Sequence, residues 1–224
     1  MCGRFTLRTP EAAISSLFPG LTIPDLKSRF NIAPTQQVAC VRNNGESNEV
    51  VELRWGLVPS WAKDLKIGAR MINARSETVE AKPSFRSAFK KRRCLVVADG
   101  YFEWKKIGKE KQPFYMTVAD GNSGFCMAGL WESWRDKQSE TIVETCTVLT
   151  TDSNSKLAAV HDRMPVVLDR ADFEYWLDPT FQSVQKLKSL MLPKPDDFFK
   201  VTAVDKIVNN VRNDSQKCVQ EVDV

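Results

Sequence analysis

Long apolar runs are absent from this chain of 224 residues. No stretch approaches the roughly 18 apolar residues that a membrane-spanning helix needs. The first residues, MCGRFTLRTPEAA, contain two arginines and no apolar segment of the kind found in secretory signals. We therefore expect no membrane partner, no export and a cytoplasmic location, with association to the nucleoid only through DNA.

Clustered metal ligands are also scarce. The chain has one histidine and six cysteines, and no two cysteines form a CxxC pair. A zinc site needs four such ligands close together, so we expect neither a metal nor a cofactor. Cys94, Cys126 and Cys146 lie within apolar runs and are interpreted as reduced core residues, which is typical of a reducing compartment.

The charge excess is small, because 32 basic and 28 acidic residues leave a net charge of +4. This balance is weak evidence for a nucleic-acid partner. The basic run at residues 90–93 (KKRR) either contacts a polyanion or forms the solvated end of a helix. The 42% of hydrophobic residues are sufficient for a globular core.

The pattern of short β-like runs predicts the fold class. The runs expected as strands are 36–42, 50–57, 94–98, 101–105, 113–119, 124–131, 142–150 and 199–204. The segments expected as helices are 9–18, 83–91, 153–160, 171–177 and 181–190. Because helices do not alternate strictly with strands, a doubly wound parallel sheet is disfavoured. We expect an α+β fold in which one domain, residues 1–224, surrounds a curved, mostly antiparallel sheet with peripheral helices. We also expect a monomer and a more loosely ordered tail after about residue 214.

The second residue carries the most distinctive chemistry. Removal of the initiator methionine would leave Cys2 with a free α-amine beside its thiol. Such a 1,2-aminothiol condenses with aldehydes to a thiazolidine ring, and an α-amine with a pKa near 8 is partly neutral at neutral pH. The alternative is that the cysteine is incidental.

Three further segments offer groups that could assist this chemistry. If residues 71–78 are extended, Asn73 and Arg75 share a face that could hold an amine and a phosphate; the alternative is a polar face with an Arg–Glu pair. Glu103 lies between two aromatic residues, where a carboxyl pKa tends to rise, or else it pairs with a neighbouring lysine. His161 either titrates at a helix-to-strand transition or is structural.

Aromatic residues and prolines beside arginines are typical of nucleic-acid surfaces. Asn31 and Pro34 follow Arg29, and Trp61 follows a Pro–Ser turn that we expect to be exposed. Such side chains can stack on bases or insert between them. Trp55, by contrast, is interpreted as a core residue.

The chain resembles the SRAP family, the SOS-response-associated peptidases or abasic-site-processing proteins. The matching segments run in family order from residue 1 to about residue 214: MCGRF, RFNIAPTQ, RWGLVPSW, INARSET, ADGYFEWK, KQPFYM, LWE, VLTTDSN, HDRMPVVL and NNVRND. Each segment alone is weak evidence, whereas all of them in order are highly specific.

The resemblance implies a function and the residues that carry it. The protein is expected to bind single-stranded DNA containing abasic sites and to crosslink Cys2 to the lesion during the response to DNA damage. Asn73 would orient Cys2, Glu103 would act as general acid and base, and His161 would assist proton transfer. The arginines that match DNA-contacting positions are Arg4, Arg75 and Arg163.

One departure and two rival functions remain open. Some relatives carry two adjacent tryptophans where this chain has only Trp61, which leaves the base-wedging residue undecided. Weak lyase activity is expected if the imine eliminates before the ring closes. The rivals are a cysteine peptidase that removes its own N-terminal extension and a nucleic-acid-binding module without catalysis.

Overall fold

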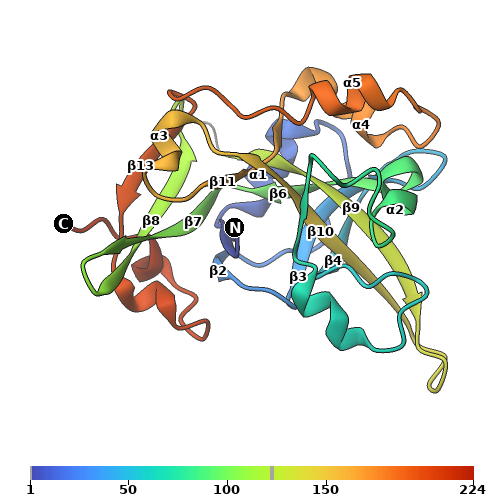
Figure 1. Ribbon diagram of the computed structural model, residues 1–224, viewed down its shortest axis with the longest axis horizontal. Coiled ribbons are helices and arrows are strands. Elements are labelled where there is room, and N and C mark those ends of the chain that lie inside the picture. Colours follow the sequence, from blue (N-terminus) through green and yellow to red (C-terminus); the bar gives the residue numbers. More distant parts are fainter. Residues whose placement is uncertain (1, 122–123) are drawn as a thin grey trace.

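Two β-sheets form the body of the protein in the computed structural model, which describes residues 2–121 and 124–224 (Figure 1). The first sheet has the spatial order β13 (Phe199–Ala203), β8 (Glu110–Val118), β7 (Gly100–Ile107), β1 (Arg4–Leu7) and β2 (Arg29–Ile32). The second has the order β11 (Arg163–Pro165), β10 (Ile142–Asp152), β4 (Asn48–Trp55), β3 (Gln37–Asn43), β6 (Arg93–Ala98), β9 (Phe125–Arg135) and β12 (Val167–Leu168), and β5 (Asn73–Arg75) also pairs with β10.

The second sheet closes on itself. Strand β10 pairs with β4 on one side and with β9 on the other, so β10, β4, β3, β6 and β9 form a continuous ring. Within this ring only the β10–β4 pairing is parallel. All six residues of β6 are buried, as expected for a strand covered on both faces. The ring therefore supplies most of the hydrophobic core.

Short helices surround the two sheets. The α-helices are α1 (Pro10–Leu17), α2 (Arg86–Lys91), α3 (Ser155–Ala158), α4 (Phe173–Leu177) and α5 (Val184–Ser189). The 3₁₀ helices are η1 (Leu65–Arg70), η2 (Arg170–Asp172), η3 (Lys206–Asn209) and η4 (Gln216–Val219). Within residues 2–121 and 124–224, none of the helices has the length and apolar character required to cross a membrane.

The predicted fold class is confirmed, with one difference of architecture. The structure is an α+β fold in which most strand pairs are antiparallel, and each of the eight predicted strands overlaps an observed one. The sequence indicated one curved sheet, whereas the structure has two. Strands β1, β2, β11 and β12 were not predicted, because runs of two to four residues become strands only through their pairing partners.

The C-terminal segment is packed rather than loose. Residues 216–219 form η4, Cys218 is fully buried, and Val204 forms a β-bridge with Glu221. Together with Phe102 and Tyr115, Cys218 belongs to a small apolar cluster on the first sheet. This segment therefore covers one face of the β7–β8 hairpin.

Arg93 attaches two helices to the closed sheet. Its guanidinium is almost fully buried and donates to the carbonyls of Trp176 (2.6 Å), Phe89 (2.8 Å), Lys90 (2.9 Å), Asp178 and Phe181 (3.1 Å). Burial lowers the pKa of Arg93 to about 10, although the nearby Asp178 charge opposes this shift. The Arg93 guanidinium therefore supplies donors to carbonyls at the C-terminal ends of α2 and α4 and to the Phe181 carbonyl beyond α4.

We expect Arg93→Met to lower the free energy of unfolding by at least about 3 kcal/mol, because hydrogen bonds to charged groups contribute about 1.5–3 kcal/mol and the buried carbonyls would lose their donors. Urea denaturation followed by circular dichroism measures this change. Arg86→Met, at an exposed position, is the control and should change stability by less than about 0.5 kcal/mol. Equal effects of the two substitutions would contradict the anchoring role of Arg93.

Candidate active site

Cys2 lies where the two sheets meet. Strand β1 pairs with β7 in the register Arg4 to Phe102 and Phe5 to Tyr101, which brings the residues before Arg4 alongside Glu103. From the second sheet, the Asn73 side chain in β5 donates to the Cys2 carbonyl (2.8 Å). The N-terminus accordingly lies at the centre of the molecule in Figure 1, between the strands of the first and second sheets.

The oxygen of the Asn73 side-chain amide is available as a hydrogen-bond acceptor. Its Nδ2 contacts Cys2, whereas its Oδ1 is buried and accepts no hydrogen bond from any residue in the described part of the chain. A buried amide oxygen without a donor is unfavourable unless a ligand or another group supplies one. The asparagine therefore offers an acceptor within reach of the backbone of Cys2.

Glu103 is a buried carboxyl group beside this asparagine–cysteine contact. Only 4% of the residue is exposed. Burial raises its pKa, and the charge of Asp162 adds to this effect, whereas the positive form of His161 lowers the pKa. The net shift is upward, so the carboxyl holds its proton to higher pH than an exposed glutamate. A buried carboxyl group of this kind can act as a general acid and, once ionised, as a general base.

The thiol of Cys2 and the phenol of Tyr101 share this environment. Both side chains are buried, and burial raises the pKa of each well above its usual range. The charge of Glu103 raises both pKa values further, which shows that the three groups lie within electrostatic range. Cys2 is therefore a neutral thiol, and any nucleophilic reaction must begin elsewhere or deprotonate it during the reaction.

His161 approaches the site from the segment between α3 and β11. The backbone N–H of Arg163 donates to its Nδ1 (3.0 Å), so the neutral imidazole carries its proton on Nε2. Nδ1 also lies 2.9 Å from the Asp162 carboxylate, a contact that requires a protonated Nδ1. Because the Asp162 side chain is 85% exposed, the backbone hydrogen bond is the stronger restraint.

The predicted arginines lie in different surroundings. Arg75 is exposed at the end of β5. Arg163 is buried and bidentate on Glu77 (2.9 and 3.0 Å), and it also contacts Asp152 and the Thr150 carbonyl (2.7 Å). The Arg–Glu pair that the sequence left open therefore exists, but with Arg163 in place of Arg75.

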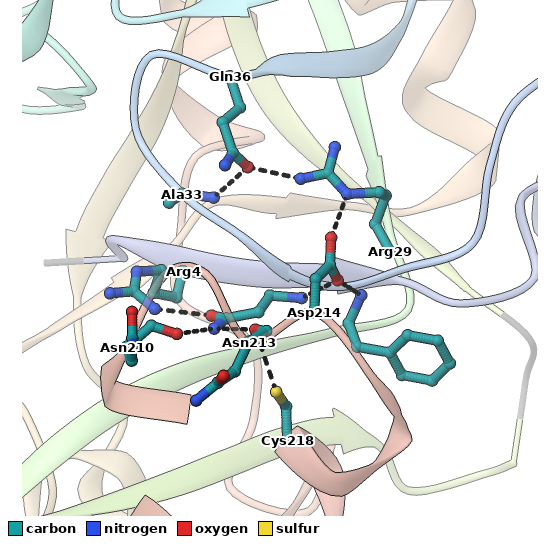
Figure 2. A network of polar contacts seen from close by, with 10 residues as sticks. Arg4, Arg29, Ala33, Gln36, Asn210, Asn213, Asp214 and Cys218 are labelled. Atoms are coloured by element: carbon teal, nitrogen blue, oxygen red, sulfur yellow. Dashed lines mark hydrogen bonds and ion pairs between the residues drawn. The ribbon is translucent and has the colours of Figure 1, made fainter. Parts of the chain in front are cut away.

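Arg4 and Asn31 bind the C-terminal segment. Arg4 donates to Asn31 Oδ1 (2.7 Å) and to the carbonyls of Val208 (2.8 Å) and Asn209 (3.3 Å). The buried Asn31 amide donates to the carbonyls of Val208 (3.1 Å), Asn210 (3.1 Å) and Asn213 (2.7 Å). Asp214 completes this network by accepting from Arg29 and from the backbone of β2 (Figure 2).

Pro34 and Trp61 lie outside the cluster formed by Cys2, Asn73 and Glu103. Pro34 is half-buried in the turn between β2 and β3, where Thr35 adopts a positive φ of 72°. Trp61 is 60% exposed and lines a cavity of about 680 Å³ with Trp134 and Lys137. Trp55 is fully buried, which confirms its interpretation as a core residue.

One polar cluster that sequence analysis missed fixes the start of the chain. The Asp99 carboxylate accepts from Thr6 Oγ1 and from the backbone N–H of Arg8 (2.6 Å), and Thr6 Oγ1 also contacts the Tyr115 hydroxyl (2.7 Å). Asp99 is buried, so these bonds replace its hydration. In the sequence, the only indication of this cluster is that Asp99 directly follows the apolar run 94–98. An aspartate at that position is equally typical of a turn.

The described residues contain no group of three or more histidine, cysteine, aspartate or glutamate side chains arranged to hold a metal ion. All six cysteines are free and buried, which confirms that Cys94, Cys126 and Cys146 are core residues. Met1, whose removal we expect, lies outside the described residues. The site therefore consists of a thiol, an amide, a carboxyl group and an imidazole.

Comparison with known proteins identifies the same sequence pattern elsewhere. The family model described as SOS response associated peptidase (SRAP) matches residues 1–211. "Abasic site processing protein YoaM" of Bacillus subtilis is 39% identical over 222 residues, which cover 96% of each chain. "Abasic site processing protein HMCES" of Gallus gallus is 30% identical over 82% of this chain and 61% of its own length. A crystal structure of a protein from Bacteroides thetaiotaomicron superposes with a TM-score of 0.86 at 27% identity, covering 99% of this chain and 100% of that one.

The raised pKa of Glu103 predicts how stability depends on pH. Between the unfolded-state pKa and the raised folded-state pKa, the folded protein keeps a proton that the unfolded chain has released, so the free energy of unfolding falls as pH rises. Below the unfolded-state pKa this contribution is absent. Glu103→Gln removes it, so the stability of the variant relative to the parent should increase as pH rises above the unfolded-state pKa of glutamate.

Denaturant unfolding of both proteins at pH values from 4 to 8 measures this difference. Glu46→Gln, at an exposed position, is the matched control and should follow the parent at every pH. Parallel curves for the parent and the Glu103 variant would contradict the raised pKa.

Proposed function

The chain belongs to the SOS response associated peptidase (SRAP) family, and on this basis we propose that it processes abasic sites in single-stranded DNA by forming a covalent bond through Cys2. The observation that carries the proposal is the contact between the Asn73 amide and Cys2 beside the buried carboxyl of Glu103. The names of the relatives support the same lesion as the substrate.

The α-amine of Cys2 is the first nucleophile. Loss of Met1 frees this amine, which attacks C1′ of the ring-opened sugar and forms an imine with release of one water molecule. The neutral thiol then adds across the imine: sulfur bonds to C1′, and the thiol proton is transferred to nitrogen. The product is a thiazolidine that shields the lesion. Because both nucleophilic atoms belong to one residue, the second step is intramolecular and strongly favoured by proximity.

Asn73 orients the amine before it reacts. Its Nδ2 already holds the Cys2 carbonyl, and its Oδ1 is a buried acceptor without a donor in the described part of the chain. An α-amine on Cys2 would supply that missing donor. The lone pair of the amine would then be directed by a side chain held in β5, rather than by solvent.

Glu103 moves the protons that these steps require. In its neutral form it donates a proton to the ring oxygen as the sugar opens, and as a carboxylate it recovers a proton from the attacking amine. The upward shift of its pKa, caused chiefly by burial, favours the protonated form that the first of these steps requires. His161 assists by stabilising the sugar oxygen or by exchanging protons with Glu103.

The same groups could also catalyse the reverse reaction, which releases the intact DNA. If the imine instead undergoes β-elimination, the DNA strand is cut.

We assign the DNA contacts according to accessibility. The exposed Arg75 binds phosphate, while Trp61 and Pro34 contact bases. Asn31 and Arg163 are buried and Arg4 is half-buried, and the donor groups of all three are engaged within the protein. These three therefore act chiefly by holding the backbone in shape beneath the DNA.

The decisive measurement is the intact mass of the purified protein before and after mixing with a single-stranded oligonucleotide that contains one abasic site. We expect a protein without Met1 and an adduct whose mass is one water less than the sum of the two partners. Cys2→Ala should form no adduct that survives denaturation, because it lacks the thiol that closes the ring. Cys218→Ala, which removes another buried thiol, is the control and should react normally.

Two outcomes would favour the rival functions. If Met1 is absent and no adduct forms, the covalent proposal fails, and DNA binding without an adduct would favour a plain binding module. The printed family description names a peptidase, so self-processing is tested separately. Cleavage of an added N-terminal tag by the parent protein, abolished in Glu103→Gln, would support that activity.

Glu103→Gln should slow the crosslinking step by about 100-fold, which is the lower range for loss of a general acid or base. Single-turnover kinetics at saturating oligonucleotide measure the rate, and the variant should also lose the pH dependence of the parent between pH 5 and 8. Glu46→Gln provides the control. An unchanged rate would contradict the proposed role of Glu103.

A further inference from the structure

The end of the β7–β8 hairpin projects beyond the rest of the first sheet. Strand β1 pairs with β7 only at residues 100–102, and β13 pairs with β8 only at residues 114–118. The register of the hairpin continues from Trp104 opposite Pro113 to Ile107 opposite Glu110. Residues 105–111 therefore form the outer part of a two-stranded ribbon without further strand partners, whereas Trp104, Gln112 and Pro113 at its base bond to residues 204–209. Figure 1 shows the end of the β7–β8 hairpin reaching away from the centre of the molecule.

This ribbon contains most of the net charge of the protein. Residues 105–111 (KKIGKEK) include four lysines and one glutamate, a net charge of +3, whereas the whole chain has a net charge of +4. The one acid, Glu110, forms an ion pair with Lys206 of η3. None of the four ribbon lysines forms an ion pair with a carboxylate in the described part of the chain.

The arrangement of these lysines is unfavourable for an isolated hairpin. Lys106 lies directly opposite Lys111, and both are exposed. Like charges at directly opposed positions destabilise a strand pair. At the tip, Lys109 is also exposed and Ile107 is 49% exposed. A polyanion that bound along the ribbon would relieve this repulsion.

The ribbon begins at the candidate active site. Glu103, Lys105 and Ile107 alternate along β7 and share one face of the strand, whereas Lys106 and the opposed Lys111 lie on the other face. The lysines of the ribbon therefore extend from both of its faces. At about 3.3 Å per residue, β7 extends roughly 13 Å from Glu103 to Ile107, where the turn that contains Lys109 begins. Phosphates follow one another at 3.4 Å per nucleotide along each strand of B-form DNA, so several of them could lie against a ribbon of this length.

We propose that the β7–β8 ribbon is a second DNA-binding element, in which Lys106, Lys109 and Lys111 bind the phosphates of the nucleotides that flank the lesion on one side. This inference rests on the proposed function, because it assigns the ribbon to the same DNA strand that reacts with Cys2. The ribbon contributes affinity that is independent of sequence, and it takes no part in the chemistry at Cys2.

The test measures binding separately from crosslinking. The probe is a single-stranded oligonucleotide with a central tetrahydrofuran residue, which lacks the aldehyde and cannot crosslink. Affinities of the parent and of Lys106→Ala/Lys109→Ala/Lys111→Ala are measured by fluorescence anisotropy between 50 and 200 mM salt. The matched control removes three exposed lysines elsewhere, in Lys27→Ala/Lys82→Ala/Lys200→Ala.

For single strands, each lost phosphate contact lowers the slope of log affinity against log salt by about 0.7, so the ribbon variant should have a slope smaller by about 2. Between 50 and 200 mM salt, the parent should then lose roughly 16-fold more affinity than the variant. The control should match the parent. A ribbon variant with the parental slope would overturn the proposal.

Oligonucleotides shortened on one flank provide a second readout. The ribbon leaves the site in one direction, so shortening one flank should abolish the difference between the parent and the ribbon variant, while shortening the other should preserve it. Equal effects of the two flanks would also overturn the proposal.

Crosslinking of the aldehyde-containing oligonucleotide is measured in parallel at saturating concentration. There the ribbon variant should react as fast as the parent. If neither protein forms an adduct but the difference in salt slope persists, the covalent function fails and the ribbon assignment stands.

Discussion

The pairing of β1 with β7 is the constraint on which the site depends. It fixes the register between the start of the chain and the strand that carries Glu103. The two ends of β1 are then restrained separately, by the Asn73 contact to Cys2 and by the buried Asp99 carboxylate that binds Thr6 and Arg8. A chain terminus is normally the most mobile part of a protein. Here Cys2 and β1 are held from both sheets, as the reaction proposed for Cys2 requires.

Burying polar groups in a core lowers the stability of the folded state. In this protein the buried polar groups include residues of the candidate site. Burial raises the pKa of Glu103 and keeps the thiol of Cys2 neutral. Asn73 has a buried oxygen for which the described residues supply no donor. The buried carboxyl of Glu103 and the amide oxygen of Asn73 reduce the stability of the folded state unless a substrate or a free α-amine compensates them. The closed second sheet, with its large hydrophobic core, provides the stability that makes such a site tolerable.

The cations of the protein have two distinct uses. Arg4, Arg93 and Arg163 are directed inward, where their guanidinium groups hold backbone carbonyls or carboxylates. Lys106, Lys109 and Lys111 of the β7–β8 ribbon, and Arg75 in β5, remain exposed. Arginine suits the first role because its planar group forms several hydrogen bonds in fixed directions, whereas lysine suits a solvated contact with phosphate. Arg75 is an arginine but is exposed like the lysines. Residue type alone therefore does not distinguish a proposed DNA contact from a structural role.

The sequence by itself determined the eight main strands, the α+β class and the family, because alternating apolar runs and ordered motifs are local properties. It also indicated Cys2, Asn73 and Glu103 as a group, but only through the resemblance to a family. Only the tertiary structure decided that the curved sheet is two sheets, that Arg163 pairs with Glu77, and that the C-terminal segment packs on the first sheet. The bonds responsible join residues far apart in sequence, and no local pattern specifies which distant partner a buried polar group will find.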